Sequence, residues 1–170
     1  MKAIRLLFIS TCILLFSATI ASAGGNDPHG YWQMAASGCM LQGGSGSAAG
    51  GTVTAEAGNY VWLVCPVNGV IDQCSNSSNG SVTSFSLYSK NSTTGGTSAA
   101  YLNQVSKATG AETAIASVSN TAASFNQALY INTSLNVDFA SNWYYIAIVL
   151  TGTGGSTETA YEVDLDCDID

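Results

Sequence analysis

The 170-residue chain is poor in basic side chains, histidine and proline. It has four Lys and Arg residues against eleven Asp and Glu residues, with one histidine and two prolines. A single histidine argues against a Ser-His-Asp hydrolase and against a zinc centre built from several histidines. The scarcity of cations disfavours binding to the phosphates of nucleic acids and to anionic lipids. We therefore expect no nucleic-acid partner and no electrostatic binding to a membrane.

Residues 1–23 have the features of a cleavable export signal. Lys2 and Arg5 precede an apolar run over residues 6–16, and Ala21-Ser22-Ala23 resembles a signal-peptidase cleavage site. Cleavage after Ala23 leaves residues 24–170 as a single domain with a formal charge of 2 − 11 = −9. No later apolar run is long enough to span a bilayer. The expected product is secreted, in the periplasm or outside the cell, with no membrane contact after cleavage.

Four cysteines remain after cleavage: Cys39, Cys65, Cys74 and Cys167. An even number in an exported chain predicts disulfides, and the absence of a CxxC pair argues against a thiolate metal site. Three connectivities are possible. We favour Cys39–Cys65 with Cys74–Cys167, and the alternative is Cys65–Cys74 with Cys39–Cys167.

Short runs of β-branched and aromatic residues alternate with clusters of Gly, Ser, Asn and Thr, which is typical of an all-β protein. Residues 43–51 form an expected loop, and the run 143–150 is an expected central strand covered on both faces. In residues 83–88, Thr83, Phe85 and Leu87 are expected to face the core. The other expected strands cover residues 60–64, 99–105, 113–118, 129–131, 135–139 and 160–168. About eight to ten strands predict an antiparallel two-sheet sandwich.

Several segments resemble those of a loosely defined, largely uncharacterised set of small bacterial exported proteins with a jelly-roll-like β-sandwich. These segments are Cys39, Val64-Cys65-Pro66-Val67, Thr83-Ser84-Phe85-Ser86-Leu87-Tyr88, Trp143-Tyr144-Tyr145-Ile146-Ala147-Ile148 and Tyr161-Glu162-Val163-Asp164-Leu165. The resemblance implies a jelly-roll-like fold and an exported location. It implies no catalytic or binding residue.

The C-terminal segment alternates acidic and apolar residues. Glu162, Asp164, Asp166, Asp168 and Asp170 occupy every second position, which on a strand places all five on one face. One hypothesis is a solvated acidic edge strand that prevents strand addition. The alternative is a Ca²⁺ site formed by Glu162, Asp164, Asp166 and Asp168, with further oxygen ligands from loops. We favour the first hypothesis, and apart from this calcium site we expect no cofactor.

Aromatic residues could instead form a platform for sugar rings. Those available are Tyr31, Trp32, Tyr60, Trp62, Trp143, Tyr144 and Tyr145. Aromatic side chains in strands are usually core residues, and we expect Tyr31 and Trp32 to be the exposed exceptions. The function predicted is therefore a non-enzymatic surface, structural or binding role. The alternatives are a carbohydrate-binding module assisted by calcium, and a hydrolase whose two carboxylates are not evident from the sequence. A glycan and a second copy of the chain are the partners considered.

Overall fold

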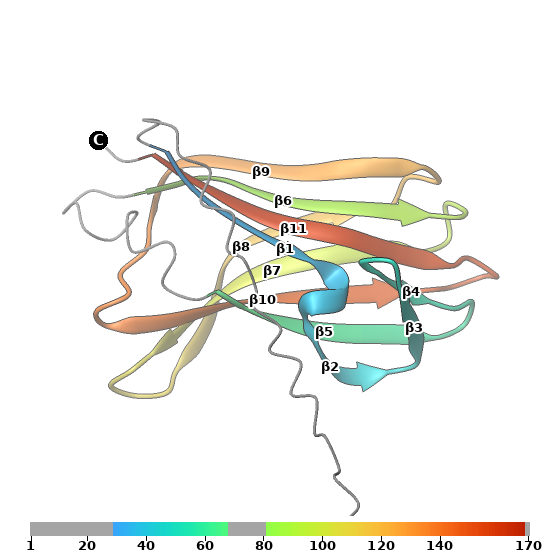
Figure 1. Ribbon diagram of the computed structural model, residues 1–170, viewed down its shortest axis with the longest axis horizontal. Helices are drawn as coiled ribbons and strands as arrows, with labels where there is room; N and C mark the ends of the chain where they lie inside the picture. Colours follow the sequence, from blue (N-terminus) through green and yellow to red (C-terminus); the bar gives the residue numbers. More distant parts are fainter. Residues whose placement is uncertain (1–28, 68–80, 169–170) are drawn as a thin grey trace, which may run out of the picture.

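The computed structural model describes residues 29–67 and 81–168, which fold into two stacked antiparallel β-sheets (Figure 1). The six-stranded sheet contains β1 (His29–Ala35), β3 (Gly46–Ala49), β4 (Thr52–Ala55), β6 (Ser81–Asn91), β9 (Phe125–Asn136) and β11 (Glu158–Asp168). The five-stranded sheet contains β2 (Met40–Gly44), β5 (Tyr60–Val67), β7 (Thr97–Ser106), β8 (Glu112–Asn120) and β10 (Asn142–Thr151). The predicted all-β, two-sheet sandwich is confirmed.

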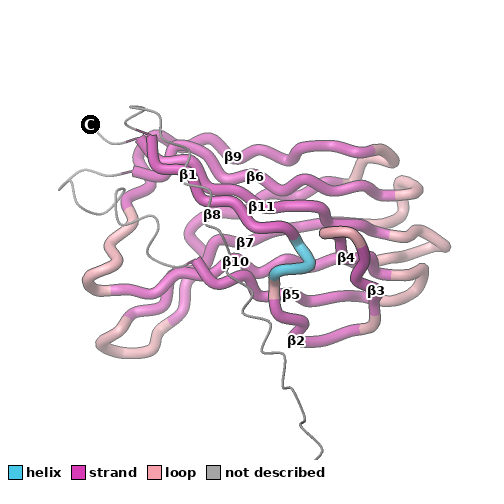
Figure 2. The backbone as a smooth tube through the Cα atoms, in the orientation of Figure 1, coloured by secondary structure: helices cyan, strands magenta, loops and turns pink. Residues whose placement is uncertain are grey.

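Successive strands cross between the sheets, which is the jelly-roll-like feature of the fold. The order β3-β4-β11-β6-β9 faces the order β2-β5-β10-β7-β8, so β8, β9, β10 and β11 alternate between the two sheets. The strand β1 pairs with β11 beyond the end of β4, and the 3₁₀ turn η1 (Ala36–Gly38) follows β1. In Figure 2 the long strands of both sheets run along the longest axis of the molecule.

Alternate side chains of the strands fill the space between the sheets. Phe85 and Leu87 of β6 are fully buried, as their alternation predicts. The predicted central position of residues 143–150 is also confirmed, because β10 lies between β5 and β7. The expectation that β10 is covered on both faces is wrong. Its inward residues are buried, but Trp143 on the outer face is 61% exposed.

Two expected segment boundaries are also wrong. Residues 43–51 contain the end of β2 and all of β3, because small residues are compatible with an extended strand as well as a loop. Residues 129–131 and 135–139 were expected to be separate strands. They belong largely to one strand, β9, which ends at Asn136 and leaves Val137 and Phe139 beyond it. Residues 152–157, between β10 and β11, form a turn with Gly154 and Gly155 at positive φ.

Among the described residues, no helix is long and apolar enough to cross a bilayer.

Candidate functional site

The first pair of predicted cysteines forms a disulfide. Cys39 is bonded to Cys65, which joins the start of β2 to the neighbouring strand β5. This connection excludes the alternative in which Cys65 pairs with Cys74. The residue Cys74 and the side chain of Cys167 lie outside the described part of the structure, so Cys74–Cys167 stays a prediction. A peptide map of the unreduced protein should recover Cys74 linked to Cys167. A free thiol at either position would contradict this pairing.

The alternating acidic strand is confirmed as a strand, but the edge position predicted for it is wrong. β11 is paired on both sides, with β6 on one side and with β4 and β1 on the other. Val163 and Leu165 point into the core, which places Glu162, Asp164 and Asp166 on the outer face of the six-stranded sheet. Period-two alternation specifies the face of each residue, whereas the position of the strand in the sheet depends on distant segments.

Neighbouring side chains form hydrogen bonds with these carboxylates. The amide of Gln33 on β1 donates to Glu162, and the hydroxyl of Tyr88 on β6 interacts with Asp164. Burial, with added repulsion from the Asp164 and Glu162 charges, raises the pKa of Tyr88. Asp164 is only 5% exposed. The face is therefore less solvated than expected, and polar cross-strand partners compensate Asp164 in place of water.

The calcium hypothesis depends on the same carboxylates. In residues 29–67 and 81–168, no three His, Cys, Asp or Glu side chains are placed to hold one metal ion. The side chain of Asp168 is outside the described residues. The predicted site of Glu162, Asp164, Asp166 and Asp168 therefore stays a prediction.

Exposed aromatic side chains gather on the outer face of the five-stranded sheet. We call this set the aromatic face, and it comprises Tyr60 and Trp62 on β5, Tyr101 on β7, and Trp143 and Tyr145 on β10. Four of them, all but Tyr145, are more than a third exposed. In each strand they alternate with buried residues that face the other sheet. The alternation that builds the core thus also forces these rings outward.

The register places the aromatic face in a line along the strand direction. Trp143 and Tyr145 lie on β10, and Trp62 and Tyr60 lie on adjacent β5, opposite Val149 and Thr151. From Trp143 to the level of Tyr60 is eight residues, or about 27 Å at about 3.4 Å per residue in an antiparallel sheet. The side chains between the rings are small and include Ala99 and Ala147. The rings therefore project above the surrounding surface of the sheet.

Very little charge lies on this sheet. Among the residues of its five strands, Glu112 on β8 is the only charged one. Its carboxylate accepts a hydrogen bond from the hydroxyl of Tyr145. Burial, followed by this hydrogen bond and the carboxylate charge, raises the pKa of Tyr145 to about 12. Glu112 thus orients a ring of the aromatic face, and the ring stays neutral over the physiological pH range.

The sequence identified part of this face. Tyr60, Trp62, Trp143 and Tyr145 were among the candidates, but Trp32 and Tyr144 are 5% exposed and belong to the core. The expected exposure of Trp32 is therefore wrong, because its neighbourhood forms the paired strand β1. The side chain of Tyr31 lies outside the described residues. Tyr101 was missed, although its place between Ala100 and Leu102, both fully buried, is the signal that could have identified it.

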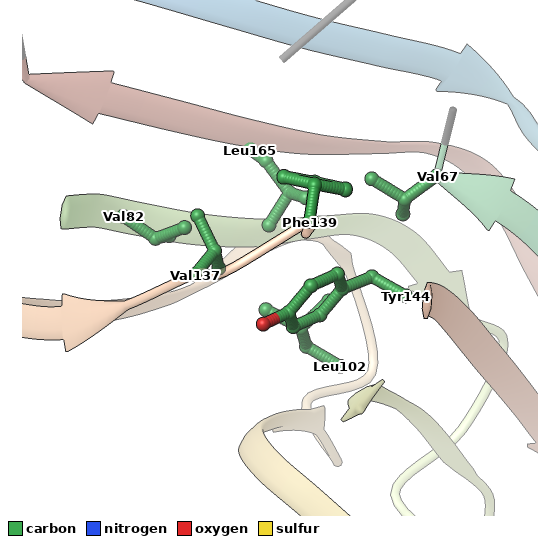
Figure 3. A pocket seen from close by; sticks show the side chains of 7 residues that line it. All are labelled: Val67, Val82, Leu102, Val137, Phe139, Tyr144 and Leu165. Carbon is green, nitrogen blue, oxygen red and sulfur yellow. The ribbon is translucent and has the colours of Figure 1, made fainter. Parts of the chain in front are cut away.

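Inside the sandwich, one end is lined by apolar side chains. Side chains from both sheets converge there around a small void (Figure 3): Val67, Val82, Leu102, Val137, Phe139, Tyr144 and Leu165. The void has no room for a water molecule. The only polar atom among these side chains is the hydroxyl of Tyr144, which accepts a hydrogen bond from the backbone amide of Asp138, 2.7 Å away. This region serves packing.

Another part of the interior carries a buried carboxylate. Glu158, at the start of β11, is fully buried, and its Oε1 accepts a hydrogen bond from the hydroxyl of Ser156. Its Oε2 has no hydrogen-bond partner among the described residues. The carboxylate packs so closely against Gly96 that a Cβ there would lie 1.5 Å from Oε1. Burial raises the pKa of Glu158, and the bond from Ser156 opposes the shift only in part.

This burial predicts a pH dependence of stability. A carboxyl group whose pKa is raised by folding binds its proton more tightly in the folded protein, so it lowers the free energy of unfolding as pH rises through its folded pKa. Glu158→Gln keeps the acceptor for Ser156 and removes the charge. We measure the free energy of unfolding by urea at pH 4 and at pH 7. When the pH is raised from 4 to 7, the variant should gain more of this free energy, or lose less of it, than the parent protein does. Parallel pH profiles for the two proteins would contradict this assignment.

Neither the protein-family models nor the curated protein sequences give a match to this chain. Among solved structures, the chain is similar to a family two carbohydrate esterase from Cellvibrio japonicus, at 9% identity and a TM-score of 0.44. The match covers 81% of this chain and 34% of the esterase, so the chain spans about a third of that protein.

Two further structures are similar at the same level. The enzymatically active domain of tailspike protein 4 from bacteriophage CBA120 matches at 10% identity and a TM-score of 0.42, over 81% of this chain and 19% of that one. A CBM4 structure matches at 9% identity and a TM-score of 0.34, over 82% and 84%. Similarity at this level carries no argument about the function of this chain.

Proposed function

We propose that this protein is an exported, non-enzymatic binding protein whose aromatic face binds an extended, uncharged polysaccharide chain. One observation carries the proposal: five aromatic rings occupy one outer sheet face, four of them more than a third exposed. Exposed aromatic side chains gathered on one face are unusual for a soluble monomer and mark interaction surfaces. The Cys39–Cys65 disulfide fits an oxidising compartment, as expected for an exported protein.

The chemistry of the face fits sugar rings. The apolar C–H face of a sugar ring packs on an aromatic ring, while its hydroxyls stay at the rim in water. The line from Trp143 to Tyr60 spans about 27 Å, enough for several sugar units in an extended chain. With Glu112 the only charged residue of this sheet, the face has no cation to select an acidic polymer. The proposed ligand is therefore uncharged.

The experiment is a binding assay with insoluble and soluble neutral polysaccharides, for example cellulose, chitin and β-glucan. Trp143→Ala should weaken binding to the recognised polymer by about tenfold, the equivalent of about 1.4 kcal/mol. Leu41→Ala is the matched control, since Leu41 is an exposed apolar residue that does not belong to the aromatic face. Equal losses in both variants would contradict the proposal.

Size-exclusion chromatography tests the competing role for the same face. A second copy of the chain could bury the aromatic rings in a dimer. In that case the parent protein would elute as a dimer and Trp143→Ala as a monomer, without binding to any polysaccharide. A monomer that binds polysaccharide through Trp143 is the result that we expect.

A further inference from the structure

An open pocket lies on the opposite sheet, away from the aromatic face. It has a volume of about 170 Å³ and lies at the end of β6 and the start of β11. The residues that line it are Lys90, Ser92, Thr157, Thr159 and Tyr161. Thr159 pairs directly with Lys90 across the two strands. We call this the Lys90 pocket. It is open to solvent and is lined by one cation and four hydroxyl-bearing side chains, one of which, Tyr161, is aromatic.

Some polar groups of the Lys90 pocket already form hydrogen bonds within the protein, and others do not. The hydroxyl of Ser92 accepts a hydrogen bond from the backbone amide of Thr157, 2.8 Å away, and Thr159 shares a hydrogen bond of 2.9 Å with Thr54. Within residues 29–67 and 81–168, the ammonium of Lys90 and the hydroxyls of Thr157 and Tyr161 have no partner. These three groups are available to a ligand.

Lys90 is distinctive because cations are so rare in this protein. The only other Lys or Arg after position 23 is Lys107, whose ammonium donates to the carbonyls of Phe139 and Ala140. Lys90 is thus the one uncommitted cation of the described structure. Because acidic residues outnumber Lys and Arg eleven to two after position 23, and Glu162, Asp164 and Asp166 lie on the same sheet face as Lys90, a polyanion would be repelled. The pocket therefore suits a single negative group carried on an otherwise neutral molecule.

A row of aromatic rings leads away from the Lys90 pocket. The ring of Tyr161 meets that of Phe125 edge to face, with centroids 5.2 Å apart, and Phe125 is 6.4 Å from Tyr88. Phe125 is 56% exposed, although it lies in the strand next to Lys90. An exposed ring held by two neighbours is a preformed surface for the apolar face of a sugar ring.

Hydrogen-bonding side chains lie beyond the aromatic row. Gln33 and Glu162 are paired there, and the amide of Gln127 donates to the hydroxyl of Ser86, 3.1 Å away. A carboxylate such as Glu162 accepts hydrogen bonds from sugar hydroxyls. From the pocket outward, the outer face of the six-stranded sheet thus presents a cation, then aromatic rings, then hydrogen-bond acceptors and amides.

We propose that this surface is a second ligand site, which binds an acidic sugar with its carboxylate at Lys90 and its ring against Phe125 and Tyr161. The hydroxyls of Thr157 and Tyr161 complete the contacts with the carboxylate. The site is independent of the aromatic face, lies on the opposite sheet and takes a different class of sugar. The protein would then recognise neutral and acidic glycans on its two faces.

The probes are a neutral oligosaccharide that carries one uronic acid residue, and the methyl ester of that residue, because esterification removes the single charge and keeps the sugar rings. By titration calorimetry we expect the acid to bind at least fivefold more tightly than the ester, and added NaCl to weaken only the acid. Lys90→Gln should reduce affinity for the acid by about tenfold and leave that for the ester unchanged. Lys90→Arg should retain most of the affinity, and Phe125→Ala should weaken both probes.

Lys107→Gln is the control matched in charge, since it lowers the net charge by the same amount at a distant position. Equal losses in Lys90→Gln and Lys107→Gln would mean non-specific electrostatics and would overturn the proposal. Inorganic phosphate and acetate are tested alone. If either binds as tightly as the singly charged oligosaccharide and Phe125→Ala has no effect, the pocket holds simple anions and the acidic-sugar site is wrong. No binding of any probe to a folded protein also overturns it, whether or not the aromatic face binds neutral polysaccharide.

Discussion

Replacing both Trp62 and Trp143 with alanine is expected to reduce the affinity for polysaccharide about a hundredfold while the protein stays folded. Both rings are on the surface, at 43% and 61% exposure, so their removal leaves no cavity in the core. If a bound sugar covers about 60 Å² of each ring, each contact contributes about 1.5 kcal/mol. The two rings are about 20 Å apart along the sheet, so their contributions should add.

Affinity electrophoresis or a depletion assay with the recognised polymer measures this loss, and thermal unfolding verifies the fold. The Tm of the double variant should stay within a few degrees of the parent value. The single variants should each lose about tenfold. A double variant that binds as well as the parent would show that the polysaccharide contacts another surface, and the assignment of the aromatic face would be wrong.

Removing the Cys39–Cys65 disulfide should destabilise the fold by about 3.5 kcal/mol. The two cysteines are 26 residues apart, and in the chain-entropy model a cross-link over a loop of this length stabilises by about this amount. The loop contains β2, β3 and β4, of which β2 and β3 are edge strands of the two sheets. Cys39→Ala with Cys65→Ala should therefore lower the midpoint of urea unfolding without abolishing the sandwich.

The control for the disulfide is the parent protein in mild reductant, which should show the same loss if this bond is the one reduced. Cys65 is fully buried, and alanine at the same position keeps part of its buried apolar surface, so the loss measured is mainly that of the cross-link. A loss below about 1 kcal/mol in the double variant would mean that the neighbouring strands hold the segment without the cross-link.

The fold class followed from local patterns, since the alternation of apolar and polar residues along a strand indicates which of its faces points into the core. Phe85 and Leu87 were expected in the core and are fully buried, and the long apolar run at Trp143 is the central strand β10. Strand position did not follow, because pairing joins segments far apart in the sequence. The acidic strand β11 was therefore placed at an edge, although Glu162 pairs with Ala35 on one side and Tyr88 on the other.

The candidate sites show the same division between local and long-range information. Tyr60 and Trp62 alternate with buried residues, so their shared face was readable, but their approach to Trp143 depends on the register of β5 against β10. Trp32 was expected to be exposed because its local sequence is polar, and pairing of β1 with β11 buries it. The Lys90 pocket combines residues about 70 positions apart, and no pattern in the sequence indicates it.

Acrylamide quenching of tryptophan fluorescence tests the central claim most directly, because the chain has three tryptophans. Trp32 is 5% exposed and acts as the internal reference, whereas Trp62 and Trp143 are open to the quencher. Saturating polysaccharide should shield both exposed tryptophans and shift the emission to shorter wavelength. Quenching that is the same with and without bound polysaccharide would show that the aromatic face stays free in the complex, which contradicts the account.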